Sequence, residues 1–94
     1  MPDLLHEYWD DEEQAMGAFG PVSVHADRRR EALNPSARLL FSLRAASFHQ
    51  AMTASYERLG YGEYVPVEDV PDHFYSEAER AEQDAYLRVR GAAE

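Results

Sequence analysis

Residues 34–60 read NPSARLLFSLRAASFHQAMTASYERLG, and this stretch decides the predicted fold. Asparagine is a good helix N-cap and proline fits the first helical turn, so a helix is expected to begin at Asn34-Pro35. Gly60 is the residue type at which a helix commonly ends in a left-handed conformation. Between these ends, apolar side chains recur at steps of three and four residues: Phe41, Ala45, Phe48, Met52, Tyr56 and Leu59. The spacing predicts one central helix of about 37 Å, long enough to cross the molecule.

The residues before this stretch also show a helical pattern. Residues 3–17 carry apolar side chains at three- and four-residue spacing, which predicts a first helix that ends before Gly20-Pro21. Four acids in its second half oppose the helix dipole, which favours acids early in a helix. Residues 21–26 alternate weakly and predict a short extended segment, and residues 27–33 predict a short helix.

The residues after Gly60 divide into a loop and a helix. Residues 61–75 read YGEYVPVEDVPDHFY, and the two prolines exclude a helix, which predicts an ordered loop. Ser76 and Glu79 form the capping-box pattern, so a last helix is expected over residues 77–90. The predicted fold is therefore all-α: one domain over residues 1–94, in which three helices and a possible short fourth one pack around the central helix.

Length and composition narrow the class of protein. A chain of 94 residues forms one domain with one hydrophobic core. It has no cysteine, which excludes disulfides and thiolate zinc sites. No run approaches the roughly 18 apolar residues of a membrane span, and the acidic amino terminus lacks the pattern of a signal peptide. We therefore expect a cytoplasmic protein without a membrane segment.

Charge is the strongest bulk signal. Eighteen acids face nine basic residues, all of them arginine, for a net charge of −9. The acids dominate residues 1–24 and 61–94, whereas most arginines lie in residues 25–60. Proteins that grip nucleic acid normally carry a basic balance, so direct nucleic-acid binding is disfavoured. Arginine in place of lysine is compatible with a GC-rich bacterial or phage genome, and so with a mobile-element origin.

No catalytic or metal-binding pattern is present. The four histidines lie in four different segments, without the ligand spacing of a zinc site. There is no nucleophile elbow, oxyanion loop or phosphate-binding glycine loop. Adjacent acids on a solvated face far outnumber catalytic pairs. We therefore expect a non-enzymatic protein with no catalytic residue, metal or cofactor.

The aromatic residues point to a partner instead. Nearly half of the aromatic side chains lie between residues 56 and 75, and their simplest role is to pin the long loop onto the central helix. Tyrosine is also enriched at recognition surfaces because it offers amphipathic contact area at low entropy cost. Three partner-facing patches are expected. The first is in the loop: Tyr61, Glu63, Tyr64, Glu68, Asp69, Phe74 and Tyr75. The second is the acidic stretch Trp9, Asp10, Asp11, Glu12 and Glu13, and the third is the arginine cluster Arg28, Arg29 and Arg30.

These patches support three hypotheses. The first is a small acidic protein-binding module (an adaptor, inhibitor or assembly factor) whose partner is another protein with a basic surface. The second is a nucleic-acid mimic whose carboxylates occupy a basic DNA- or RNA-binding channel. The third and weakest is DNA binding through the arginine cluster. A homodimer is a further alternative, because the central helix carries apolar residues on more than one side.

Overall fold

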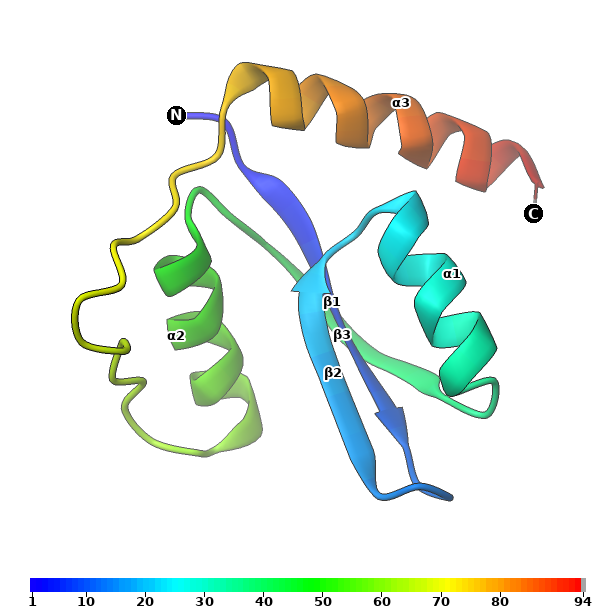
Figure 1. Ribbon diagram of the computed structural model, residues 1–94, viewed down its shortest axis with the longest axis horizontal. Helices are drawn as coiled ribbons and strands as arrows, with labels where there is room; N and C mark the ends of the chain where they lie inside the picture. The colour runs from blue at the N-terminus through cyan, green and yellow to red at the C-terminus, as the bar shows by residue number, and fades with distance from the viewer. Residues whose placement is uncertain (94) are drawn as a thin grey trace.

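The all-α prediction is wrong: the computed structural model is a small α+β fold. It describes residues 1–93. The elements in chain order are β1 (Leu4–Asp11), β2 (Met16–Pro21), α1 (Val24–Leu33), β3 (Arg38–Ala45), α2 (Phe48–Leu59) and α3 (Glu77–Ala93). In Figure 1 the three strands lie between α2 on one side and α1 on the other, and α3 crosses above them.

The three strands form one antiparallel sheet in the order β2-β1-β3. Strands β1 and β2 make a hairpin in which Tyr8 lies opposite Phe19. On the other side, Tyr8 lies opposite Phe41 of β3. The register then shifts, so that Trp9 lies opposite Leu39. The prediction of a helix over residues 3–17 is therefore wrong. The four consecutive acids that opposed the dipole of that helix lie at the end of β1 and in the hairpin turn.

The expected central helix is also wrong, because residues 34–60 divide into a strand and a helix. Phe41, Leu43 and Ala45 alternate with Ser42 and Arg44, which is the period of a strand with one buried face. The Ser47 side chain then accepts a hydrogen bond from Gln50 N (3.2 Å) and caps a new helix. Gly60 ends α2 in the left-handed conformation with φ 73°, as predicted. Self-association was expected because an apolar helix was predicted to cross the molecule. Since residues 34–60 do not form that helix, this reason no longer applies.

The core lies between the sheet and α2. Leu4, Ala45, Ala51 and Tyr75 are buried there, and His6 is fully buried. The His6 ring takes the tautomer in which Nδ1–H donates to the Leu4 carbonyl (2.9 Å), because a carbonyl can only accept. Its Nε2 then accepts from the Tyr75 hydroxyl (2.7 Å). Burial lowers the pKa of His6 and raises the pKa of Tyr75 to about 12, so both groups stay neutral in the folded protein at neutral pH.

Helix α3 is held across the other face of the sheet by polar contacts. It begins with the predicted capping box, in which Glu79 N donates to Ser76 Oγ (3.1 Å) and Ser76 N donates to Glu79 Oε1 (3.0 Å). Near its other end, the Arg90 guanidinium donates to both carboxylate oxygens of Glu7 (3.2 and 2.9 Å). Arg90 Nε also lies 3.3 Å from a carboxylate oxygen of Asp27 on α1. One arginine thus ties α3 to both β1 and α1.

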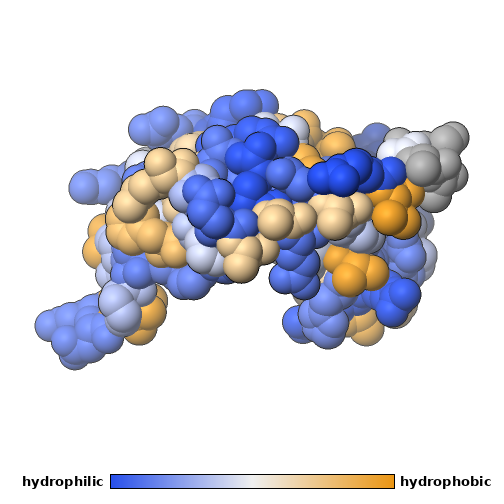
Figure 2. All heavy atoms as spheres, turned by 90° about the horizontal axis from the view of Figure 1, so that it is seen from above, coloured by the Kyte–Doolittle hydropathy of each residue, from blue (hydrophilic) through white to orange (hydrophobic). Residues whose placement is uncertain are grey.

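The outer surface of this side is largely hydrophilic, with smaller hydrophobic areas between the polar side chains (Figure 2). Within residues 1–93, no helix combines the length and the apolar character needed to cross a bilayer.

Candidate partner-binding surface

The segment between α2 and α3, residues 60–76, runs back along α2 (Figure 1). At its start, Tyr61 N donates to the Tyr56 carbonyl (3.0 Å), which closes the end of α2. At its end, Tyr75 N donates to the Ala46 carbonyl (3.0 Å), just before α2 begins. Phe48 N, at the first residue of α2, also donates to the His73 carbonyl (3.0 Å), so the segment is fixed at both ends of α2. We call residues 61–74 the return loop.

The last residues of the return loop cap the amino-terminal end of α2. The Asp72 carboxylate accepts a hydrogen bond from His49 N (2.9 Å), in the first turn of that helix. The helix dipole favours a negative charge at this position. Partial desolvation acts in the opposite direction, but the hydrogen bonds from His49 and its neighbours hold the pKa of Asp72 below its ordinary value. Asp72 is thus an anchor for the return loop.

Tyrosine rings anchor the first residues of the return loop. The Tyr56 ring of α2 meets Tyr61 edge-on at 5.5 Å between centroids and Tyr64 at 5.2 Å. Tyr61 also contacts the Tyr8 hydroxyl, and burial together with this contact raises the pKa of Tyr8. The rings therefore pin this end onto α2 and the sheet, which is the simpler of the two roles expected for them. Tyr61 nevertheless remains 62% exposed.

The middle of the return loop carries apolar side chains that are largely exposed. Val65, Val67 and Val70 are 76%, 68% and 55% exposed. A turn shapes this part, in which Val70 N donates to the Val67 carbonyl (3.2 Å) and Asp69 adopts φ 65°. Aspartate tolerates this left-handed conformation better than most residues. The result is a short projection with valines and acids on its surface.

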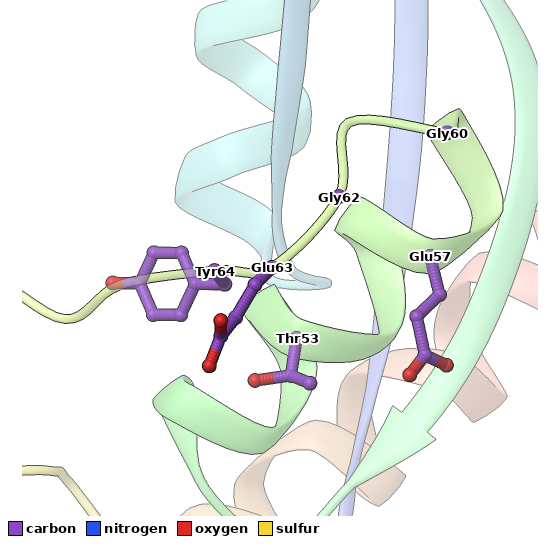
Figure 3. A pocket seen from close by; sticks show the side chains of 6 residues that line it. All are labelled: Thr53, Glu57, Gly60, Gly62, Glu63 and Tyr64. Carbon is purple, nitrogen blue, oxygen red and sulfur yellow. The ribbon is translucent and has the colours of Figure 1, made fainter.

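A shallow hollow of about 550 Å³ lies where the return loop leaves α2. It is lined by Thr53, Glu57, Gly60, Gly62, Glu63 and Tyr64. Figure 3 shows the carboxylates of Glu57 and Glu63 pointing to the same side, with Thr53 between them. Neither carboxylate forms an ion pair with the part of the chain that the structure describes. The hollow therefore offers two unpaired negative charges to a cationic group.

The structure brings most residues of the expected loop patch to one surface. Glu63 and Tyr64 line the hollow, Tyr61 is exposed at the start of the return loop, and Glu68 and Asp69 lie in its exposed middle. Phe74 is 47% exposed at the far end, where it forms an isolated bridge with Ser47. Tyr75 is different: it is buried against His6 and belongs to the core.

The second expected patch does not form a single surface. Trp9 lies on β1, where its indole N–H donates to Glu7 (3.1 Å) and the Arg30 guanidinium stacks 3.6 Å above its ring. Asp11 is buried and accepts hydrogen bonds from Gln14 N and the Asn34 amide, which shapes the hairpin turn. The exposed acids of this patch are Glu12, which pairs with Arg38 (2.9 Å), and Glu13, which accepts from Ser36. Asp10 is half-buried at the end of the strand.

The third expected patch, the arginine cluster, is divided in the same way. Arg30 is engaged with Trp9 and with Asp27, whose carboxylate lies 2.8 Å from its guanidinium. Arg28 and Arg29 remain exposed on α1, on the opposite side of the sheet from the return loop. Two neighbouring cations offer little of the counterion release that drives binding to DNA.

Sequence reasoning missed Thr53 and Glu57 as candidate site residues. They are four residues apart on α2, and therefore share the helix face onto which the return loop begins to fold. The sequence shows the four-residue spacing of Thr53 and Glu57, but it does not show the path of the return loop beside them. Among residues 1–93, no three histidine, aspartate or glutamate side chains are close enough together to hold a metal ion.

The return loop and the hollow beside it form the candidate binding surface of the protein. No protein-family model matches the chain, and no curated protein or solved structure is significantly similar to it.

Proposed function

We propose that the protein is a non-enzymatic protein-binding module, an adaptor, inhibitor or assembly factor, that recognises a basic partner through the return loop. The observation that carries the proposal is the exposure of Val65, Val67 and Val70 on a segment fixed at both ends. We place its action in the cytoplasm, in keeping with a chain that lacks cysteine.

The exposed valines supply the apolar part of the interface. Burying apolar surface contributes about 25 cal/mol per Å², and one fully buried valine contributes about 1.5 kcal/mol. The loop is also preorganised, because Pro66, Pro71, the tyrosine contacts and the Asp72 cap restrict its conformations. Binding then loses little conformational entropy, which favours affinity.

The acids supply the preference for a basic partner. Glu57, Glu63, Glu68 and Asp69 are exposed and form no ion pair with the described residues. Elsewhere, several acids are already neutralised, as in the pairs of Glu7 with Arg90 and Glu12 with Arg38. An arginine or lysine of the partner fits the hollow between Glu57 and Glu63. Four acids without an ion pair to the described residues therefore lie on the return loop or on α2 where the loop begins.

The test replaces these valines and compares them with valines elsewhere. The partner is captured from a lysate of the source organism with the wild-type protein, identified and purified, and its affinity is measured. The variant Val65→Ser/Val67→Ser/Val70→Ser should lose more than about tenfold in affinity, while its circular dichroism stays unchanged. The control Val24→Ser/Val89→Ser changes valines that are 44% and 67% exposed on α1 and α3. Equal losses in the two variants, or no loss in the loop variant, would contradict the proposal.

Salt dependence separates this function from nucleic-acid mimicry. A mimic binds through its carboxylates, so its affinity should fall by orders of magnitude between low and moderate ionic strength. An interface anchored by valines and tyrosines should lose much less. The loss of several acids to internal ion pairs favours the protein-binding module over the mimic.

A further inference from the structure

Helix α1 is held at its ends and along one polar edge, not by apolar packing. Its only buried side chain is Asp27, and its apolar residues Val24 and Leu33 are 44% and 57% exposed. A helix of ten residues is marginal in water and normally depends on packing of an apolar face. Here, polar contacts replace that packing: the Tyr86 hydroxyl and Arg90 bind Asp27. Helix α1 therefore stands away from the sheet.

A cleft of about 360 Å³ separates α1 from the face of the sheet opposite α2. Strand β2 turns Met16, Ala18 and Gly20 toward this cleft, since these residues alternate with Phe19 on the other face. A Cβ added at Gly20 would meet no atom within 4 Å. The cleft is open because small side chains line β2 where a helix usually packs. Its volume is at the lower end of the range of about 300–1,000 Å³ found for small-molecule sites.

The walls of the cleft combine apolar surface with two acids and two arginines. Met16 and Leu33 are 54% and 57% exposed at its rim, and Trp9 forms part of its floor. The two acids in its lining, Glu7 and Asp27, are both paired with Arg90.

Two lining arginines add positive charge to this surface. Arg30 pairs with Asp27, whereas Arg29 forms no ion pair with the described residues. In a protein with a net charge of −9, the cleft thus presents an unpaired guanidinium beside uncovered apolar side chains.

We propose that this cleft binds a small amphipathic carboxylate. Its apolar body lies along Ala18 and Gly20 of β2, beside Met16 and Leu33. Its carboxylate pairs with the guanidinium of Arg29, which is suited to bidentate recognition of such groups. The ligand supplies the apolar contact that α1 lacks. The site lies across the sheet from the return loop, so it is independent of the proposed partner surface (Figure 1).

The test uses a naphthoate ion and the matching neutral naphthamide, which share one apolar body and differ in charge. Each is titrated into the full chain while backbone amide shifts are followed by NMR. Naphthoate should shift the amides of β2 and α1 with a dissociation constant of about 1 mM or lower. The amide should bind about tenfold more weakly, because it lacks the charge-assisted hydrogen bonds.

Three variants assign the site. Arg29→Gln should reduce naphthoate affinity to that of naphthamide, whereas the exposed neighbour variant Arg28→Gln should leave it unchanged. Gly20→Leu should fill the cleft and remove binding of both compounds, and Ala18→Leu serves the same purpose if Gly20→Leu does not fold.

Three outcomes would overturn the proposal. They are the absence of shifts at β2 and α1 up to about 10 mM, equal binding of the ion and the amide, and naphthoate affinity that survives both Arg29→Gln and the filled cleft.

Discussion

The side-chain amide of Gln83 hydrogen-bonds both the backbone N–H and the backbone C=O of Leu5, 78 residues earlier in the chain. Its Oε1 accepts from Leu5 N (2.8 Å), and its Nε2 donates to the carbonyls of Leu5 and Val22 (3.0 Å each). Leu5 precedes the first residue of β1 that pairs with β2. The amide of Gln83 therefore continues the hydrogen bonding of the sheet past the end of β2, and it fixes α3 to the sheet.

Replacing Gln83 should destabilise the whole domain. In Gln83→Ala, the Leu5 N–H and the Val22 carbonyl lose their side-chain partner at a buried position, which costs about 2–3 kcal/mol of unfolding free energy. Urea unfolding followed by circular dichroism measures this loss. The control Glu82→Ala changes the exposed neighbour and should stay within about 0.5 kcal/mol of wild type. Similar values for the two variants would mean that the Gln83 contacts add little to stability.

Replacing Arg90, near the end of α3, should destabilise the domain. Arg90→Ala leaves the buried carboxylates of Glu7 and Asp27 without their shared cation, which costs about 3 kcal/mol. Arg90→Lys should recover only part of this loss, because lysine cannot donate to both oxygens of Glu7 as a planar fork does. Arg88→Ala, on the exposed side of α3, is the control for the same chemical change. A loss below about 1 kcal/mol in Arg90→Ala, measured in urea, would refute the role of the shared cation.

The sequence predicted those features that depend on neighbouring residues. The Ser76–Glu79 capping box, the left-handed Gly60 and the proline-containing loop were all visible locally and are confirmed. The strands were missed because their evidence is not local. Phe41 and Ala45 satisfy both the helical spacing of four and the alternation of a strand, and only pairing with β1 decides between the two.

The candidate site was predictable in composition but not in arrangement. The clustering of rings and acids in residues 61–75 singled out the segment that becomes the return loop. It did not show that Tyr75 points into the core while Val65 and Val67 point into solvent. Those directions depend on how the loop is fixed to Ala46 and His49, two residues that the sequence assigned to one helix.

Stability should fall as the pH drops below about 6.5, because of His6. Burial lowers the pKa of His6 in the folded protein, so the unfolded chain takes up a proton there that the folded chain does not. Protonation of His6 does not affect the free energy of unfolding above the pKa of the unfolded chain. The free energy of unfolding then falls as the pH drops toward the lower pKa of the folded protein, with a slope of at most about 1.4 kcal/mol per pH unit. Urea unfolding between about pH 5 and 7.5 measures it. The slope should vanish in His6→Gln and persist in His25→Gln, which changes an exposed histidine. An NMR titration in which the His6 ring protonates at its ordinary pKa would contradict this account.

Gly17 should not tolerate a side chain, although Gly20 on the same strand should. A Cβ at Gly17 would lie 2.1 Å from the Tyr8 hydroxyl oxygen, whereas one at Gly20 would meet nothing within 4 Å. Tyr8 cannot move freely, because its ring stacks on Phe41 at 5.4 Å between centroids. Gly17→Ala should therefore cost about 1–2 kcal/mol, and Gly20→Ala should be close to neutral. Thermal unfolding of the two variants makes the comparison, and an equal melting temperature would show that Tyr8 moves aside at no cost.

The proposed binding function is tested most directly by site-specific photo-crosslinking in a cell lysate. A benzoylphenylalanine is placed at Val67, in the exposed middle of the return loop, and in a second protein at Ala81, on the exposed side of α3. The account predicts one dominant protein adduct from position 67, reduced by Glu63→Gln/Glu68→Gln, and no such adduct from position 81. The same adduct from both positions, or an adduct from position 81 alone, would contradict it.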